Sequence, residues 1–227
     1  MATHLTEEEQ IESLKRWWSE NGKFTVIVVL AAIAGYFGWQ AWTKHQVQQK
    51  QEASSLYQSM LDSSTLAPGE TLDEDKYNRA ISLGKQLQEG FSGSYYSVAG
   101  ALMMAKLDVE KGSLDSAITY LEWAKKNNDD AELDIVIDPR LARLYVAKEK
   151  FDEALALVAK APKPAAVSSY AELRGDIYAA KGDSAKSSES YQLALSSLSD
   201  QQSNRRRFIE MKLSEQAVSS SSVAEAE

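Results

Sequence analysis

The sequence predicts an all-α protein in which a single N-terminal transmembrane helix precedes an α-solenoid, a stack of helical hairpins. Three observations predict this architecture. A long stretch near the N-terminus is apolar and uncharged, the rest of the chain favours helix without sustained period-two alternation, and similar segments recur about every 35 residues. The expected regions are an amphipathic leader over 1–23, the transmembrane helix over 24–43, the repeat domain over 44–216 and a disordered Ser-rich tail over 217–227.

The composition excludes several classes of functional site. The chain of 227 residues has no cysteine, two histidines and a net charge of −8. Without cysteine there can be no zinc ribbon, disulfide scaffold, thiol nucleophile or iron–sulfur cluster. The histidines, His4 and His45, flank the apolar stretch, so no histidine metal site is expected, and the acidic balance argues against nucleic-acid binding. We therefore expect no cofactor and no metal.

The leader has the pattern of a short amphipathic helix. Thr6 followed three residues later by Glu9 fits a capping box at its start. The apolar side chains that share one helical face are Ile11, Leu14, Trp17 and Trp18. We expect this helix to lie on lipid headgroups and to end near Asn21-Gly22.

The following stretch has the length of a membrane span. No charged residue occurs from Phe24 to Thr43, and Lys23 and Lys44 bracket it. At about 1.5 Å per residue, the apolar part covers about 28 Å, close to the thickness of the hydrocarbon core. Trp39 and other tryptophans lie near its ends, where indole rings favour the membrane–water boundary.

A cleaved signal peptide is the competing interpretation of this stretch. Ala32-Ile33-Ala34 has the small-x-small form of a cleavage site. However, apolar residues continue beyond Ala34, and five carboxylates in the leader are unusual for a signal peptide, so an uncleaved anchor is favoured. Lys15, Arg16 and Lys23 precede the span against Lys44 and Lys50 just after it, which favours a cytoplasmic N-terminus.

Small residues form one stripe of the predicted span. At 100° per residue they fall within about 120° of arc. This predicted intramembrane packing face consists of Ala31, Ala34, Gly35, Gly38 and Ala41. Such a stripe lets a partner helix approach closely, although Ala and Gly are also common in spans with no partner.

Helices are expected throughout the chain after the span, with the prolines at their boundaries. The expected ranges are 44–62, 73–88, 95–111, 114–126, 138–148, 151–160, 168–181, 184–198 and 203–216. The prolines are Pro68, Pro139, Pro162 and Pro164. The last helix is expected to cap the stack through Phe208, Met211 and Ile209, with Arg205-Arg206-Arg207 as its solvated face.

Three segments, 104–124, 141–161 and 174–194, align without a gap. Small residues recur where paired helices would cross, and Gly112, Glu149 and Gly182 share the turn position. The expected packing residues are Ala105, Ala117, Ala124, Ala142, Tyr145, Ala154, Gly175, Tyr178, Tyr191 and Ala194. This pattern resembles the tetratricopeptide repeat, because a larger side chain at the crossing would push the helix axes apart. Asp108 replaces an aromatic residue in the first repeat, which is therefore degenerate.

The sequence indicates binding and no catalysis. No nucleophile-elbow, zincin, P-loop or dinucleotide-binding motif occurs, and Ser82 with Lys85 is only a weak S-x-x-K match. Stacked hairpins form a concave surface lined by the first helix of each pair. The residues expected on it are Leu102, Lys106, Val109, Arg143, Val146, Glu172, Asp176 and Ala179. Their mixture of apolar and charged types suits polypeptide segments.

Several stretches together resemble a known family. They are the span VIVVLAAIAGYFGWQAWTKHQ, Pro139-Arg140-Leu141-Ala142-Arg143, Ala171-Glu172-Leu173-Arg174-Gly175-Asp176, Lys181-Gly182-Asp183 and Met211-Lys212-Leu213. In this order they resemble the YfgM-like ancillary SecYEG translocon subunits of Gram-negative bacteria. The Ser-rich tail and the loop with Pro162 and Pro164 depart from that pattern.

The resemblance implies a single-pass inner-membrane protein with a cytoplasmic N-terminus and a periplasmic repeat domain. It also implies two partners, the SecYEG translocon and a PpiD-like membrane-anchored periplasmic chaperone, and a role in passing emerging polypeptides to chaperones. No catalytic residue is implied. A membrane-anchored scaffold for another cell-envelope assembly complex would share these sequence features, so that alternative stays open.

Overall fold

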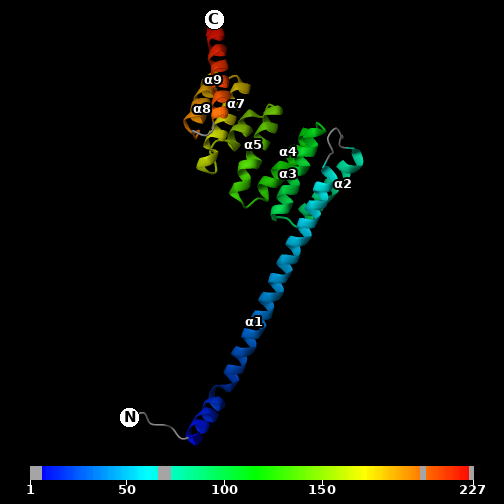
Figure 1. The fold of residues 1–227 in the computed structure, drawn as a ribbon, viewed down its shortest axis with the longest axis vertical. Helices are drawn as coiled ribbons and strands as arrows, with labels where there is room; N and C mark the ends of the chain where they lie inside the picture. Colours follow the sequence, from blue (N-terminus) through cyan, green and yellow to red (C-terminus); the bar gives the residue numbers. More distant parts are fainter. Residues whose placement is uncertain (1–6, 66–72, 200–202, 225–227) are drawn as a thin grey trace, which may run out of the picture. The chain divides into compact units, whose positions relative to one another are not determined.

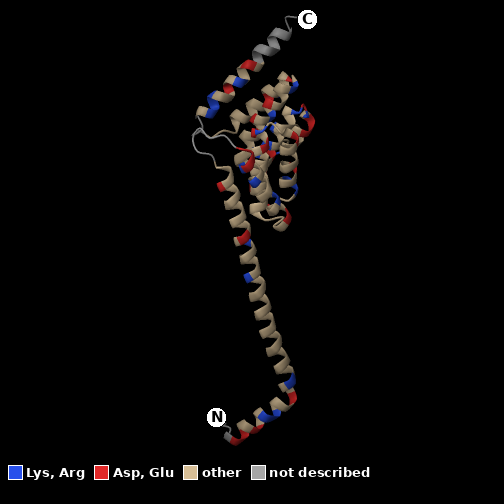
Figure 2. Ribbon diagram, turned by 90° about the vertical axis from the view of Figure 1, so that its right-hand side faces the viewer, with Lys and Arg blue, Asp and Glu red and all other residues tan. Residues whose placement is uncertain are grey.

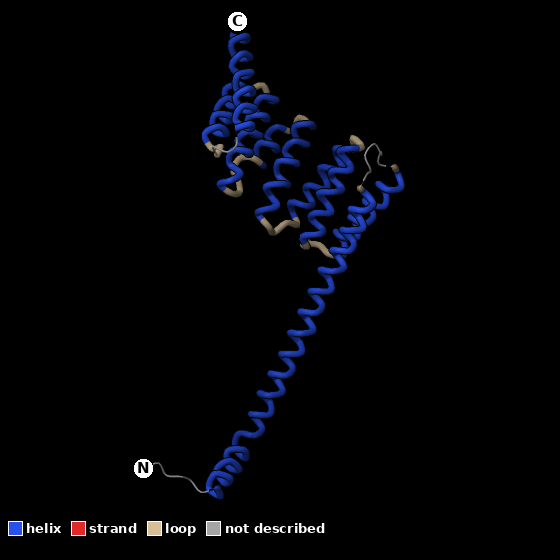
Figure 3. Tube along the Cα trace, viewed as in Figure 1, coloured by secondary structure: helices blue, strands red, loops and turns tan. Residues whose placement is uncertain are grey.

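The computed structural model describes residues 7–65, 73–199 and 203–224, and these residues are helical with short connections and no strand (Figures 1 and 3). The chain divides into two compact units, residues 1–52 and 53–227. The all-α prediction is confirmed. Pro68 lies outside the described residues.

The first helix, α1 (Glu7–Ser64), joins the expected leader, span and first repeat-domain helix into one element. It has a segment with mean hydropathy 1.7 and none of that segment is buried in the protein, so by length and composition it can cross a membrane. Figure 2 shows the uncharged stretch of α1 beyond the charged leader.

The expected end of the leader helix near Asn21-Gly22 is wrong, because α1 continues through both residues. The Asn21 side chain donates to the Trp17 carbonyl at 3.2 Å, and the Thr25 hydroxyl donates to the Asn21 carbonyl at 3.0 Å. A Cβ on Gly22 would lie 3.1 Å from the Trp18 indole. Asn21 and Gly22 therefore lie within the helix, where local side-chain hydrogen bonds and the Trp18 indole contact them. Figure 2 shows that α1 changes direction near the start of its uncharged stretch.

In the part of the second unit that the structure describes, three helical hairpins lie between flanking helices. The hairpins are α3 (Tyr95–Glu110) with α4 (Leu114–Lys126), α5 (Ala131–Ala147) with α6 (Phe151–Leu157), and α7 (Val167–Lys181) with α8 (Ser184–Ser196). The flanking helices are α2 (Glu74–Gly90) and α9 (Ser203–Ala224), and the short 3-10 helix η1 (Pro164–Ala166) precedes α7.

The core is built of apolar clusters that are shared between successive elements. The end of α1 contributes Ala53 and Met60 to a cluster with α2 and α3, and Ile209 of α9 lies in a cluster with α7 and α8. The two clusters between them join α3 to α5 and α5 to α7. Each hairpin is thus stabilised by its neighbours, as in an α-solenoid.

The three hairpins close with the same turn. Gly112, Glu149 and Gly182 all have a positive φ, at 76°, 59° and 85°. In each turn the N–H of the next residue donates to a carbonyl five positions earlier: Ser113 to Asp108 at 2.8 Å, Lys150 to Tyr145 at 2.8 Å and Asp183 to Tyr178 at 2.9 Å. This hydrogen-bond pattern is that of a Schellman motif, which ends a helix with a left-handed residue.

The beginning of α5 differs from the prediction. The helix starts at Ala131, and Pro139 lies inside it, although a boundary was expected at 138. Asp130 caps the start by accepting from the Glu132 N–H at 2.8 Å. Pro139 cannot donate to the Ile135 carbonyl four residues earlier. The Tyr170 hydroxyl binds the adjacent part of the helix by donating to the Asp134 carbonyl at 3.1 Å. Capping and tertiary contacts thus hold a helix that the proline alone would have interrupted.

Two further boundaries also differ. The expected helix over 151–160 ends at Leu157, and the chain then passes through Pro162 and Pro164. At the other end of the domain, the backbone of α9 is helical to Ala224, whereas disorder was expected from 217. Serine and alanine cost little in a helix that has already begun, since propagation adds one hydrogen bond per residue.

Candidate functional site

The residues expected at the helix crossings lie inside the hairpins. The structure buries Ala105, Ala117, Ala124, Ala142, Ala154, Gly175, Tyr191 and Ala194, and it half-buries Tyr145 and Tyr178. Gly175 shows why size matters, because an added Cβ would lie 2.5 Å from the Tyr191 ring. The Ser187 hydroxyl also donates to the Gly175 carbonyl at 2.9 Å, which ties α8 to α7.

A groove runs along the first helices of the hairpins. Its first hollow, of about 350 Å³, is lined from α3, α4 and α5 by Leu102, Ala105, Lys106, Val109, Glu110, Leu121, Arg140, Arg143 and Leu144. The second, of about 340 Å³, is lined by Ile135, Val136, Pro139, Arg140, Arg143, Ser169, Glu172, Leu173, Asp176 and Arg205. Because Arg140 and Arg143 line both hollows, we treat them as one surface, the repeat groove.

The repeat groove combines an apolar floor with basic side chains. Leu102, Val109 and Leu144 supply apolar surface in the first hollow. Lys106 lies 3.6 Å from Glu110, and Arg143 donates to the Pro139 carbonyl at 3.3 Å. A groove of this kind can bury apolar side chains of a polypeptide while arginines contact its carbonyls or carboxylates.

The structure places most of the residues expected on the concave surface in this groove. Leu102, Lys106, Val109, Arg143, Glu172 and Asp176 line it. Val146 instead packs against the cluster shared by α5, α6 and α7, and Ala179 does not line the groove. Both lie in the last turns of their helices, beyond the groove.

Sequence reasoning missed two cations at one end of the groove. Glu172, 8 % exposed, accepts from Arg205 Nε at 3.0 Å, from another Arg205 nitrogen at 2.8 Å and from Lys212 Nζ at 3.0 Å. Lys212 also donates to Asp176 at 2.7 Å. Arg205 was expected only as part of a solvated face. Its side chain is 44 % exposed, but it also pairs with Glu172, because a buried carboxylate requires a charged partner. The signal available in the sequence was a pair of carboxylates one turn apart on an otherwise buried helix.

The apolar contacts of α9 also differ from the expectation. Ile209 is 0 % exposed and covers the last hairpin, whereas Phe208 and Met211 are each 49 % exposed. The Lys212 ammonium lies 4.8 Å from the centre of the Phe208 ring. The ion pairs of Arg205 and Lys212 set the face that α9 turns toward α7, and this face contains Ile209.

Two buried carboxylates on the repeat helices, Asp108 and Asp138, accept hydrogen bonds from neighbouring helices. Asp108, where the repeat usually has an aromatic residue, accepts from the Tyr77 hydroxyl at 2.5 Å, and this hydrogen bond raises the pKa of Tyr77 to about 12. Asp138 accepts from Lys125 Nζ at 2.5 Å. Burial nevertheless raises the pKa of Asp138 above its ordinary value of 3.8, against the opposing effect of Lys125. These contacts join α2 to α3 and α4 to α5.

The expected intramembrane packing face is open. Ala31, Ala34, Gly35, Gly38 and Ala41 are all exposed, and no other part of the described chain lies within 4 Å of a Cβ added at Gly35 or Gly38. Ser82 and Lys85 lie exposed on α2, and the described residues contain no group of three potential metal-ligating side chains.

Comparisons with known proteins match the whole arrangement. The model of the tetratricopeptide repeat-like domain family matches residues 15–218. Three proteins, each described as an ancillary SecYEG translocon subunit, are similar over most of their lengths. The one from Aggregatibacter actinomycetemcomitans is 31 % identical over 86 % of this chain and 91 % of its own, and the one from Haemophilus influenzae is 29 % identical over the same shares. The Escherichia coli (strain K12) protein is 28 % identical over 81 % of this chain and 84 % of its own. The chain therefore belongs to the YfgM-like family of ancillary SecYEG translocon subunits, which carry a tetratricopeptide repeat-like domain.

Proposed function

We propose that this protein is a membrane-anchored, non-catalytic accessory subunit of the SecYEG translocon. The observation that carries the proposal is that relatives with that description cover 81–86 % of this chain and that one family model matches residues 15–218, which include the apolar stretch of α1 and the repeats. The exposed apolar segment of α1 supports a membrane location. The charge distribution around the span supports a cytoplasmic N-terminus and a periplasmic repeat domain.

The open stripe of small residues suits a protein partner within the membrane. Gly35 and Gly38 leave room for another helix to approach the α1 backbone closely, and close packing is a main source of helix association in lipid. In the proposed complex this partner helix belongs to SecYEG or to a PpiD-like chaperone.

The repeat groove suits the second part of the proposed role, which is to link emerging polypeptides to periplasmic chaperones. An apolar floor accepts side chains from an unfolded segment or from a chaperone, and Arg140 and Arg143 can contact its polar groups. A groove that binds by general apolar burial and arginine contacts would accept many sequences, as a translocon accessory requires.

The experiment is mass spectrometry of the proteins that co-purify with the tagged full chain after mild detergent extraction. We expect SecYEG subunits and a membrane-anchored periplasmic chaperone. Recovery of cell-wall or outer-membrane assembly proteins without SecYEG would refute the translocon role and support the alternative scaffold. In spheroplasts, added protease should digest the repeat domain, and its protection would contradict the proposed orientation.

Replacing both Arg140 and Arg143 by Glu distinguishes the contribution of the repeat groove to partner recovery from that of the anchor. SecYEG recovery should persist in this variant if α1 makes that contact, whereas recovery of the chaperone and of unfolded polypeptide should fall. Lys85→Glu, on the exposed face of α2, is the matched control and should behave as wild type.

A further inference from the structure

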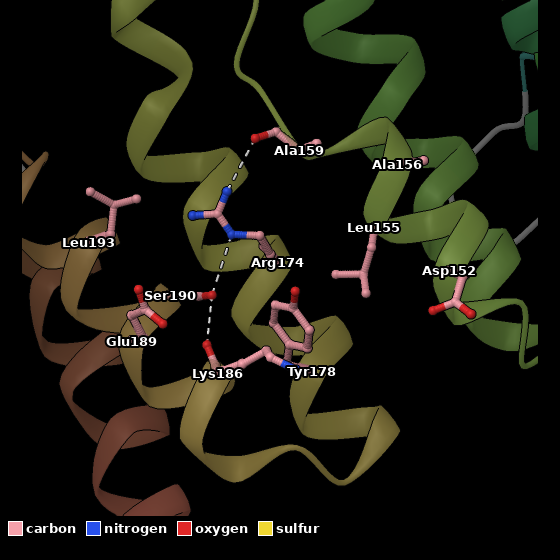
Figure 4. A pocket seen from close by; sticks show the side chains of 10 residues that line it. All are labelled: Asp152, Leu155, Ala156, Ala159, Arg174, Tyr178, Lys186, Glu189, Ser190 and Leu193. Atoms are coloured by element: carbon pink, nitrogen blue, oxygen red, sulfur yellow. Dashed lines mark hydrogen bonds between the residues drawn. The ribbon is translucent and has the colours of Figure 1, made fainter.

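The outer side of the domain has a hollow of about 630 Å³ between α6 and α8 (Figure 4). The α6 helix has 7 residues, whereas α4 and α8, its counterparts in the neighbouring repeats, have 13 each. Pro162 and Pro164 follow α6, and each lacks an N–H and disfavours helix before it.

This hollow continues into a second one beside the proline loop. The second has about 500 Å³ and is lined by Pro162, Pro164 and Val167 among others. Ala159, Arg174 and Leu193 line both hollows. We call the combined surface the outer groove. The first hollow has apolar walls from Leu155 of α6 and Leu193 of α8 and polar walls from charged side chains, and the second hollow is mainly apolar.

At the junction of the two hollows lies an arginine without a charged partner. Arg174 Nε lies 3.4 Å from the Ser190 hydroxyl, and another of its guanidinium nitrogens lies 3.4 Å from the Ala159 carbonyl. Both contacts are long and both acceptors are neutral (Figure 4). None of the ion pairs within the described residues includes Arg174, although its side chain is half-buried.

The other charges along the outer groove are arranged differently. Lys186 pairs with Asp183 at 2.7 Å, and Asp152 pairs with Lys181 at 2.5 Å. Glu189 lines the same hollow but is exposed and makes no ion pair with Arg174. Lys160 and Lys163 line the second hollow, where Lys163 pairs with Glu132 and Lys160 is exposed. Arg174 is therefore the half-buried cation of the groove that none of the ion pairs within the described residues neutralises. Its neighbours Glu172 and Asp176 lie in the repeat groove and contact α9, so α7 presents opposite charges on its two sides.

We propose that the outer groove binds a segment of a partner polypeptide in which a carboxylate lies between apolar side chains. The carboxylate pairs with Arg174 in the forked geometry that guanidinium and carboxylate share. The apolar side chains cover Leu155 and Leu193, of which Leu193 is 42 % exposed. A groove in which Leu155 and Leu193 lie on either side of a half-buried cation favours a chain segment over a free anion, which would leave these apolar side chains in water. The site lies apart from the repeat groove and goes beyond the proposed function.

The test begins with a library of random peptides displayed on phage and selected on the full chain in detergent micelles. Peptides selected by the wild type should be enriched in Asp or Glu flanked by apolar residues, and Arg174→Gln should not select them. The best peptide should bind the wild type at least about tenfold more tightly than its version with Gln in place of the acidic residue. Arg174→Lys should retain part of this difference, since it keeps the charge but loses the fork.

Two further variants show which groove is responsible. Arg143→Gln removes a cation from the repeat groove and should leave the selected peptide bound as in the wild type. Leu193→Glu places a carboxylate beside Arg174 at an exposed position. This variant should block peptide binding without lowering the unfolding temperature. It therefore tests the proposal even if Arg174→Gln unfolds. Glu189→Gln should tighten binding by removing a competing carboxylate. Failure to select any peptide, no preference for acidic peptides, or binding that survives Leu193→Glu would overturn the proposal.

Discussion

At the scale of single residues, Glu149 occupies a position that its neighbours in the repeat fill with glycine. Its φ of 59° lies in the left-handed region, where a side chain costs about 1–2 kcal/mol. Gly112 and Gly182 make the same turn with φ near 76° and 85°. The turn is therefore imposed on Glu149 by the packing of α5 and α6.

Replacing Glu149 by glycine should raise the free energy of unfolding. We expect a gain of about 0.5–1 kcal/mol, because the relief of the left-handed strain exceeds the extra entropy that glycine gives the unfolded chain. Gly182→Ala is the matched opposite change and should lose about 1 kcal/mol. Urea unfolding of the full chain in micelles, followed by circular dichroism, measures both, and a loss of stability in Glu149→Gly would contradict the account of this turn.

The buried carboxylate of Asp138 gives the protein a pH dependence of defined sign. Burial raises the pKa of Asp138 in the folded chain above 3.8, its ordinary value in the unfolded chain. Between these two pKa values, the folded chain holds the proton more tightly than the unfolded chain. The contribution of Asp138 to stability is therefore present at low pH and falls as pH rises through the folded-state pKa.

Asp138→Asn removes this titration while keeping the shape of the side chain. The free energy of unfolding of the variant, relative to wild type, should be higher at about pH 7 than at about pH 4. Asp129→Asn, in the exposed loop before α5, is the control for removing a carboxylate. A difference that is constant or smaller at the higher pH would show that Lys125 outweighs burial in the folded state.

At the scale of elements, the docking of α9 depends on ion pairs that the sequence did not reveal. Arg205→Gln should lower the free energy of unfolding by about 1 kcal/mol, because the buried Glu172 would lose one of its two cationic partners and keep Lys212. Arg207→Gln, on the exposed side of the same turn, should change it by no more than about 0.5 kcal/mol. Equal effects of the two changes would mean that the Arg205 pair does not hold α9.

Sequence patterns predicted the helical hairpins but not every helix boundary or ion pair. Small residues at fixed spacing predicted the hairpins, because a crossing of two helices sets a limit on side-chain size that few residues meet. The beginning of α5 was not predicted, because Pro139 was weighed as a boundary while the Asp130 cap and the Tyr170 contact depend on the loop and on a residue far along the chain. The pairing of Arg205 with Glu172 was hidden for the same reason.

At the scale of the whole molecule, the span and the repeats were both predictable, because each has a periodicity or length that physics restricts. The two grooves on the surface of the repeat domain were less predictable from the sequence. Six of the eight residues predicted for the concave surface line the repeat groove, but the register did not predict other lining residues such as Arg140. The outer groove was not predicted, because the short α6 beside it ends at Leu157 and not at 160.

The proposed function depends on an anchor that would bring the repeat domain to the translocon through a specific helix contact. The most direct measurement is photo-crosslinking in the membrane from a benzoylphenylalanine placed at Gly35, with Val29 on the opposite side of α1 as the control position. We predict that Gly35 crosslinks to a helix of SecYEG or of a membrane-anchored chaperone and that Val29 gives mainly lipid adducts. Lipid adducts alone at Gly35, or the same protein captured equally from both positions, would contradict the account.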